Sequence, residues 1–408
     1  MTRSGYVPAS TGAPLRPLQA SQDVQLAMWM SEPAKEKHQP SPTRAMPSNK
    51  VTIFLTGATG YIGGSILQRL LAHPNGKNFE ITTLVRSADK AKRLESEFGV
   101  KAVIGSLQDL DKLATLTENA HVTIQAADCD DVNAITAVLS GLKARHEKTG
   151  DVPILIHTSG TGELMDDARG AFKSEKVWSD LNIADIEALP PTAIHRPVDV
   201  LVVAADVAGY ARTHIILPSA IYGVATGPLF DAGISNPHTM IFPIYVRSAL
   251  HHGHLAILND GASHWASVHI DDVTDIYVRI LDGNLSNPEK VSHGREGYFF
   301  GANDEFSARE GLQPVADALF ALGRISSPEL VKYSFDDIAK YYTSALPAFG
   351  VYGGQFLARA LFSNTRCSAD RARRELGWAP THTTKDLIAG LSSEVATLAK
   401  KVDAEKSV

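Results

Sequence analysis

From about residue 50 onward, the hydrophobic positions of the chain alternate between short continuous runs and helically spaced stripes. The first run, at residues 51–55, is apolar and β-branched, as expected of a strand buried on both faces. Beyond a glycine-containing turn, one apolar helical stripe is formed by Ile62, Ile66, Leu67, Leu70 and Leu71. Further strands are predicted over residues 79–85, 102–104, 121–126, 153–157 and 213–217, with a charged helix over residues 88–98. This alternation predicts right-handed β-α-β units and a doubly wound parallel α/β sheet.

The first 49 residues have a different composition. They are rich in proline, serine, threonine, glutamine and lysine, and they lack apolar periodicity. Such a segment cannot bury enough surface to offset its ordering entropy, so we expect residues 1–49 to be a disordered extension. A targeting peptide is the alternative, but Asp23, Glu32 and Glu36 break the acid-poor pattern of such peptides. Met46, just before the first strand, is a hypothetical second start site.

Composition and charge narrow the classes of partner. Of the 408 residues, 44% are hydrophobic and 21% are charged, as in ordinary globular proteins. Lys plus Arg number 39 against 45 for Asp plus Glu, a net charge of −6 without a basic run, which argues against nucleic acid or an anionic membrane as partner. No apolar run approaches the roughly 20 residues that cross a bilayer. We therefore expect a cytoplasmic protein that acts on a small molecule, with its assembly into a homodimer left open.

Neither the cysteines nor the histidines form a metal-binding pattern. Cys129 and Cys367 are far apart and stand outside any C-x-x-C or Cys/His spacing, which fits a reducing compartment. His251, His252 and His254 cluster around a glycine, but no acid or cysteine nearby completes a ligand set. We therefore expect these to be solvated loop histidines, and no metal site.

The turn after the first strand reads T-G-A-T-G-Y-I-G over residues 56–63. Between a strand and an amphipathic helix, this spacing is typical of dinucleotide binding. Gly57 allows the sharp turn, Gly60 lets the backbone approach a pyrophosphate, and Gly63 lets the helix pack on the strand. The helix beginning near Tyr61 directs free N–H groups and its positive dipole end at the phosphates. An ATP-type P-loop is excluded, because no Gly-Lys-Ser/Thr follows the turn.

The end of the second strand indicates which dinucleotide is bound. Where an acid would hold the ribose 2′-hydroxyl of NAD, the sequence has Arg86. A guanidinium there can hold a 2′-phosphate by charged, bidentate hydrogen bonds. NADP is therefore favoured as cofactor over NAD, although Asp89 nearby keeps a solvated Arg86 as the alternative.

With the glycine turn, later segments in the same order resemble the extended or atypical short-chain dehydrogenase/reductase superfamily. That superfamily includes nucleotide-sugar epimerases, dihydroflavonol-reductase-like enzymes and NmrA-like redox sensors. Residues 216–223 (I-L-P-S-A-I-Y-G) resemble its "R-P-x-x-V-Y-G" segment, residues 265–273 (W-A-S-V-H-I-D-D-V) its "F-V-H-V-x-D-V" segment, and residues 375–380 (E-L-G-W-A-P) its "L-G-W-x-P" segment. The resemblance covers the chain from about residue 51 to 388.

The resemblance implies where the cofactor lies. Ala126 and Ala127 would line its adenosine and pyrophosphate side, and Pro218 and Ile221 its nicotinamide side. Ser106 replaces the acid that usually contacts adenine, which puts that contact in doubt. The full expected cofactor-binding set is Gly57, Thr59, Gly60, Tyr61, Ile62, Gly63, Arg86, Leu107, Ala126, Ala127, Thr158, Pro218 and Ile221. We expect an NAD(P)-binding Rossmann domain over residues 50–235 and a smaller substrate lobe over residues 236–400, from which the chain returns to the Rossmann core.

Enzymes of this superfamily transfer protons with a Ser or Thr after the fifth strand and a Tyr-x-x-x-Lys pair. Ser159 or Thr161 can supply the hydroxyl here, although Gly160 can occupy the usual serine position and an ordinary turn is the alternative. The Tyr-Lys pair is missing, since Tyr210 is followed four residues later by His214.

In this superfamily an acidic residue follows the Tyr-Lys pair on the same helix. Aligning an acid of this chain with that residue indicates which residues replace the tyrosine and the lysine. With Asp199 as this acid, His195 takes the lysine position and Pro191 the tyrosine position. His195 could still act as a general acid, but a helix-start residue bonded to backbone is the competing interpretation.

These observations leave two functions from different classes. The first is an NADP(H)-dependent oxidoreductase that moves hydride between the nicotinamide and a carbonyl or alcohol carbon, with catalytic candidates Ser159, Thr161 and His195. The apolar residues 241–246, with Arg247 as their only close cation, favour a small, weakly charged substrate. The second is a catalytically silent NADP-binding sensor of the NmrA-like kind, supported by the missing pair. A nucleotide-sugar epimerase or dehydratase is a third alternative, weakened by the same absence.

Overall fold

The computed structural model describes residues 50–347 and 350–406. The extension predicted to be disordered, residues 1–49, lies outside the described residues. Within the described part of the chain, no helix combines the length and the apolar character needed to span a bilayer.

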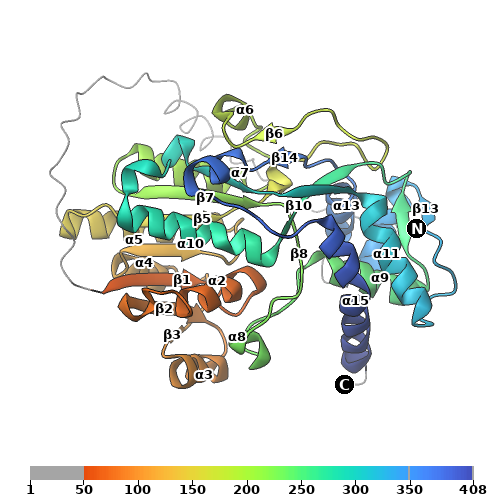
Figure 1. The fold of residues 1–408 in the computed structure, drawn as a ribbon, viewed down its shortest axis with the longest axis horizontal. Helices are drawn as coiled ribbons and strands as arrows, with labels where there is room; N and C mark the ends of the chain where they lie inside the picture. Colours follow the sequence, from red (N-terminus) through yellow and green to blue (C-terminus); the bar gives the residue numbers. More distant parts are fainter. Residues whose placement is uncertain (1–49, 348–349, 407–408) are drawn as a thin grey trace, which may run out of the picture. The chain divides into compact units, whose positions relative to one another are not determined.

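In the described residues, seven parallel strands form the central sheet, in the order β11-β7-β5-β4-β1-β2-β3 (Figure 1). The strands are β1 (Val51–Thr56), β2 (Phe79–Val85), β3 (Lys101–Ile104), β4 (Val122–Gln125), β5 (Ile154–Thr158), β7 (Arg212–Pro218) and β11 (Tyr298–Gly301). The predicted doubly wound parallel α/β fold is confirmed. All six predicted strands are present, each within one residue of its predicted ends. The strand β11 was not predicted; it is short and is separated from β7 by residues 219–297.

Helices cover both faces of the sheet, as right-handed crossovers require. On one face lie α2 (Tyr61–Leu71), α3 (Ala88–Phe98) and α10 (Ile270–Ser286), with α2 packed against α10. On the other lie α4 (Leu110–Glu118), α5 (Val132–Thr149) and α7 (Arg196–Val207), packed in that order (Figure 1). The sheet reverses its order between β1 and β4, so ligands are expected at the carboxyl ends of these two strands.

A second hydrophobic core lies in the C-terminal half of the chain. Its helices are α9 (Ile241–His252), α11 (Ala308–Ala321), α12 (Phe335–Ala345), α13 (Gly350–Ala360) and α15 (Thr384–Lys406). They pack beside a three-stranded sheet of β12 (Asp304–Ser307), β10 (His264–His269) and β8 (Ala220–Tyr222). Tyr341 and Tyr342, which begin an aromatic stretch of the sequence, are buried in this core.

Shorter elements connect these parts. Two-stranded sheets join β9 (Ala256–Leu258) to β13 (Val331–Tyr333) and β6 (Trp178–Ser179) to β14 (Cys367–Ser368). Short helices are α6 (Ile183–Glu187), α8 (Pro228–Asp231) and α14 (Asp370–Leu376), with 3-10 turns η1 (Gly76–Asn78), η2 (Thr161–Leu164), η3 (Pro288–Lys290) and η4 (Gly294–Glu296).

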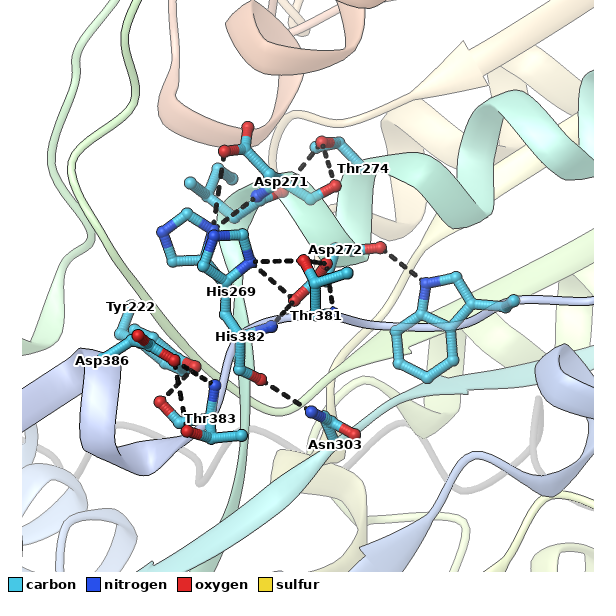
Figure 2. A network of polar contacts seen from close by, with 12 residues as sticks. Tyr222, His269, Asp271, Asp272, Thr274, Asn303, Thr381, His382, Thr383 and Asp386 are labelled. Carbon is cyan, nitrogen blue, oxygen red and sulfur yellow. Dashed lines mark hydrogen bonds and ion pairs between the residues drawn. The ribbon is translucent and has the colours of Figure 1, made fainter.

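The segment between α14 and α15 is tied to the start of α10 (Figure 2). The carboxylate of Asp272 accepts the backbone N–H groups of Thr381 and His382, at 3.1 and 3.0 Å. The His382 ring stacks on His269, with 3.8 Å between ring centroids. These contacts fix where α15 begins.

Candidate cofactor and active site

The glycine turn between β1 and α2 leaves no room for side chains at two of its positions. Gly57 has φ +76°, and a Cβ there would lie 2.1 Å from the carbonyl oxygen of Ala126 on the neighbouring strand end. A Cβ at Gly63 would lie 2.3 Å from the carbonyl oxygen of Gly57. The N–H of Gly60 donates to that same carbonyl at 2.8 Å and closes the turn. The backbone thus makes the close approach that a dinucleotide-binding turn requires.

The start of α2 is suited to an anion. Gly60 is the N-cap, and no side chain caps the helix there, so a ligand can accept the N–H groups of the first turn. Residues 235 and 236 border the same turn, because Ser235 Oγ donates to Ala58 O at 2.8 Å and Asn236 N–H to Thr59 O at 3.1 Å. An uncapped helix start beside a glycine cradle fits the pyrophosphate of a nicotinamide dinucleotide.

Arg86 directly follows the carboxyl end of β2, the strand that pairs with β1. Its side chain is exposed and makes no ion pair or hydrogen bond within residues 50–347 and 350–406. Such a guanidinium can pair with a phosphate at no cost of breaking an internal bond. Ser106, in place of an adenine-binding acid, donates through N–H and Oγ to Asp109 Oδ2.

A cavity of about 680 Å³ begins at the start of α2 and extends into the C-terminal lobe. Six predicted site residues line it: Tyr61, Ile62, Ala126, Ser159, Pro218 and Ile221. The far wall is mostly apolar, with Met240, Ile241, Pro243, Ile244, Leu346, Leu398 and Val402. Two cations, Arg247 and Lys401, stand at this far wall, and Arg247 pairs with Glu405 at 2.6 Å.

The other predicted residues do not line this cavity. Gly57, Thr59, Gly60 and Gly63 form the turn beside it. Arg86, Leu107 and Ala127 lie at or just beyond the ends of β2, β3 and β4, and Thr158, Thr161 and His195 lie near the end of β5. Leu107 packs against a small hydrophobic cluster between the sheet and α4.

The three hydroxyl residues at and beyond the end of β5 have different surroundings. Thr158 Oγ1 is buried, 2.9 Å from the hydroxyl of Tyr277 on α10. Thr161 is buried at the start of η2 and does not reach the cavity. Ser159 lines the cavity, and its hydroxyl donates to Asp199 Oδ2 at 2.6 Å. Ser159 is therefore the candidate hydroxyl that a bound molecule can touch.

A buried polar cluster lies behind Ser159. Asp199, on α7, is fully buried, with Oδ1 3.3 Å from His157 Nε2. Arg196 Nη1 lies 3.4 Å from Glu163 Oε1 and donates to the Tyr298 hydroxyl at 3.0 Å. Burial, and then the charge of Asp199, hold the pKa of Glu163 well above the usual carboxyl value. This cluster was not predicted from the sequence, where its only signal is a pair of charged residues, Arg196 and Asp199, at the start of an apolar helix.

His195 caps α7 from a left-handed backbone conformation, with φ +68°. Its Nδ1 lies 2.8 Å from Asp130 Oδ1 and 3.3 Å from Cys129 Sγ, and its N–H donates to the same Asp130 oxygen. Burial lowers the pKa of His195, but the hydrogen bonds to Asp130 and Cys129 outweigh it and raise the pKa to about 10. Its Nε2 lies against Gly160 and Gly162. His195 is thus a charged, anchored residue beside the cavity.

Two groups of side chains could hold a metal ion, although no metal site was expected. Cys129, Asp130 and His195 bring ligand atoms within 4.8 Å of one another, as do His269, Asp271 and His382. The prediction of three loop histidines is wrong for two of them, because His251 and His252 are the last residues of α9. His252 Nε2 lies 3.0 Å from the carbonyl oxygen of Tyr341, and His254 Nε2 lies 2.8 Å from the hydroxyl of Tyr333.

Known proteins with similar sequences or structures include proteins that bind nicotinamide dinucleotides, in agreement with the glycine turn and the cavity described above. Residues 57–178 match a family model described as NAD(P)H-binding. The solved structure of a dTDP-glucose 4,6-dehydratase from Streptomyces venezuelae is similar at a TM-score of 0.54 and 17% identity, over 84% of this chain and 95% of that one. UDP-glucose 4-epimerase from Thermotoga maritima is similar at a TM-score of 0.56 and 13% identity, over 85% and 99%.

The chain shares its fold with these dehydratase and epimerase structures. A curated relative, the oxidase ucsJ of an Acremonium species, is 29% identical over 80% of this chain and 92% of its own length. An uncharacterized protein of Schizosaccharomyces pombe, C2A9.02, is 25% identical over 84% and 98%. A nicotinamide cofactor is therefore supported, since the domain is NAD(P)H-binding and the dehydratase structure holds NAD.

The sequence resemblance predicts a Tyr-x-x-x-Lys pair on the helix that precedes β7, which is α7. It begins at Arg196, so Pro191 precedes the helix and His195 caps it. Tyr210 follows the helix end at Val207. No tyrosine or lysine of α7 can act on the cavity, because the helix contains neither. Of the polar side chains that line the cavity, Ser159 follows β5 and has Asp199 behind it, while Asn236, His238, Thr239, Arg247 and Lys401 come from later in the chain.

Proposed function

We propose that the protein is an NADP(H)-dependent oxidoreductase that moves hydride between the nicotinamide and a carbonyl or alcohol carbon of a small molecule. One observation carries the proposal: a single cavity contains the uncapped start of α2, the hydroxyl of Ser159 and an apolar wall. A cofactor seated on the turn would extend its nicotinamide past Ala126 toward Pro218 and Ile221. A substrate on the apolar wall would then meet it beside Ser159.

Arg86 supports NADP as the cofactor rather than NAD. It is exposed, its charge is not neutralised within the described residues, and it follows the strand that ends at the adenosine ribose in this fold. A 2′-phosphate would give it a charged partner. Gly57, Thr59, Gly60, Tyr61, Ile62 and Gly63 would hold the pyrophosphate, with Leu107, Ala126, Ala127 and Thr158 along the rest of the cofactor.

The cavity wall supports a small substrate of low charge. Its residues beyond Ile221 are mostly apolar, and one of its two cations, Arg247, is already paired with Glu405. A sugar nucleotide, as named for the dehydratase and epimerase structures, carries a pyrophosphate that would need more free positive charge. The relative named as an oxidase fits the oxidoreductase class.

The proton donor in this proposal is not the usual tyrosine. Ser159 would hold the substrate oxygen, with Thr161 behind it in the η2 turn. His195 is the second candidate, since its raised pKa keeps it charged at neutral pH. The absent tyrosine–lysine pair favours a second function, that of a catalytically silent NADP-binding sensor.

Binding and turnover measurements separate the two functions. Quenching of tryptophan fluorescence measures NADPH binding. NADPH oxidation is measured with aliphatic and aromatic aldehydes and ketones as substrates. The reverse reaction is measured with NADP⁺ and the corresponding alcohols. Turnover of at least one of these compounds is expected. Tight NADPH binding without any turnover would instead identify a sensor, and a protein that binds neither NADPH nor NADH would refute both.

We also infer a cytoplasmic location, with residues 50–235 as the cofactor domain and residues 236–400 as the substrate lobe. The cavity between them is complete within one chain, so activity would not require a homodimer. Light scattering at the assay concentration measures the oligomeric state, and the dependence of turnover on protein concentration shows whether a homodimer is needed for activity. Specific activity that falls on dilution would show that a dimer is needed.

A further inference from the structure

Ser159 has its only proton committed to Asp199. The Ser159 Oγ–Asp199 Oδ2 distance is 2.6 Å, and Asp199 is fully buried while Ser159 faces the cavity. A hydroxyl has one proton and two lone pairs. While Asp199 is ionised, Ser159 therefore presents only lone pairs to the cavity, and it can accept a hydrogen bond from an alcohol but cannot donate one to a carbonyl.

The environment of Asp199 contains more acceptors than donors. Within the described residues, neither Asp199 Oδ1 nor Glu163 Oε2 receives a hydrogen bond, although both are buried. His157 Nε2, 3.3 Å from Asp199 Oδ1, also lacks a hydrogen-bond partner. Buried polar atoms without partners are costly. A proton on one of the two carboxyls would supply a hydrogen-bond donor to this cluster.

The net charge of the buried cluster also indicates that it holds an additional proton. The groups that face Asp199 come from four elements: His157 on β5, Glu163 on η2, Arg196 on α7 and Tyr298 on β11. With both carboxyls ionised and His157 neutral, these groups carry a net charge of −1, since only Arg196 among them is positive and the nearby His195 is paired with Asp130. An uncompensated buried charge is strongly disfavoured, and a stored proton makes the cluster neutral.

We propose that Ser159 and Asp199 form a proton relay that takes the place of the tyrosine–lysine pair, with Ser159 touching the substrate and Asp199 acting through it as a positioning residue. Glu163 holds the stored proton behind them, and His157 lies against the second carboxylate oxygen of Asp199. The relay rests on the proposed hydride-transfer function, and it explains how that function operates without a tyrosine.

The relay balances both protons and electrons. In alcohol oxidation, NADP⁺ held at the proposed cofactor site would accept the hydride, and the substrate C–H bond would break with its electron pair. The substrate O–H proton passes to Ser159 Oγ while the Ser159 proton passes to Asp199 Oδ2. The product is a carbonyl compound. The proton on Asp199 returns through Ser159 to water in the cavity when the product leaves. Carbonyl reduction is the reverse, from protonated Asp199.

His195 is less suited to this role. It does not line the cavity, and its Nδ1 is already bonded to Asp130. It contributes a fixed positive charge near the cluster, where its charge acts on Glu163.

The stored proton can be observed in the free protein, without substrate or cofactor. Infrared spectra at pH 7 should contain the C=O stretch of a buried, protonated carboxylic acid. Glu163→Gln should remove this band, because Asp199 and Arg196 then balance without an extra proton. Asp206→Asn is the matched control: Asp206 is on the same helix and pairs with His293, and its replacement should leave the band in place. A wild-type spectrum without the band, or a band that survives both Glu163→Gln and Asp199→Asn, would overturn the relay.

Kinetics with NADP⁺ and the alcohol panel test the role of Asp199. Asp199→Asn keeps the shape of the side chain but cannot take a proton, so kcat should fall about 100- to 1000-fold while the Kd for NADPH changes little. The acidic limb of the kcat–pH profile and the solvent isotope effect should disappear, and Ser159→Ala should behave similarly and non-additively with it. Asp206→Asn should keep the wild-type profile.

Equal losses of kcat in Asp199→Asn and Asp206→Asn, with unchanged pH profiles, would show that Asp199 is only structural. Absence of turnover by the wild-type protein would instead count against the proposed function, while the infrared result would still decide on the stored proton.

Discussion

The indole N–H of Trp378 donates to the backbone carbonyl of Asp272 at 2.8 Å, in the buried interior. Trp378 belongs to the "L-G-W-x-P"-like segment and Asp272 to the "F-V-H-V-x-D-V"-like segment, so two sequence features about 100 residues apart form one contact. The Asp272 carboxylate then holds the backbone at Thr381 and His382 (Figure 2). This anchor leads into α15, from which Leu398 and Val402 reach the cavity wall. The two segments therefore support the substrate side of the cavity.

Removing this anchor should destabilise the protein. Asp272→Ala leaves the N–H groups of Thr381 and His382 without an acceptor, and we expect the free energy of unfolding to fall by about 2–4 kcal/mol. Asp271→Ala is the control, because the neighbouring Asp271 side chain is 60% exposed and its ion pair with Arg69 is long, at 3.9 Å. Its loss should be under about 1 kcal/mol. Urea unfolding measures both, and equal losses would show that Asp272 is not an anchor.

The glycine turn should tolerate no side chain at Gly57. In Gly57→Ala the new Cβ meets the Ala126 carbonyl at 2.1 Å, so the turn must open, and we expect NADPH affinity to fall at least about 10-fold, or about 1.4 kcal/mol. Gly99→Ala provides a matched control. Gly99 has a similar φ of +66° but nothing within 4 Å of its Cβ. It should cost about 1–2 kcal/mol of stability through strain, with an unchanged Kd for NADPH. Fluorescence titration separates the two, and an unchanged Kd in folded Gly57→Ala would contradict the assignment of the turn.

Local sequence features were sufficient to predict the sheet and the turn. The six predicted strands are continuous apolar runs, and burial on both faces makes such runs easy to recognise. The role of Gly57 follows from residues close to it in sequence. The contact between Ser159 and Asp199 does not, because it depends on how α7 packs against the end of β5, 40 residues earlier in the chain. The same holds for His195 and Asp130, which lie 65 residues apart.

Arg86 should discriminate between the two cofactors. Arg86→Gln removes the charge proposed to hold the 2′-phosphate, and the Kd for NADPH should rise about 10- to 100-fold, the loss of one charge-assisted hydrogen-bonded pair. The Kd for NADH, which lacks this phosphate, should not change. Lys92→Gln, an exposed cation on the following helix α3, is the control for general surface charge. If Arg86→Gln and Lys92→Gln weaken NADPH equally, or if NADH binds as tightly as NADPH to the wild type, NADP is not the preferred cofactor.

The pairing of His195 with Asp130 should be visible in the pH dependence of stability. His195 has its pKa raised to about 10 in the folded protein, against about 6.5 unfolded. The raised pKa therefore contributes stability that is complete below about pH 6.5 and is lost as the pH rises toward 10. Asp130→Asn should return the His195 titration toward or below 6.5 and flatten this pH dependence. The loss near pH 6 should be only about 1 kcal/mol, because the Asp130 side chain is half exposed and screened by solvent.

Asp131→Asn is the control, since Asp131 caps α5 and does not bond to His195. Proton NMR titration of the histidine rings, with His195→Gln for assignment, measures the shift. A wild-type His195 that titrates near 6.5 would show that Asp130 does not hold it in the charged form.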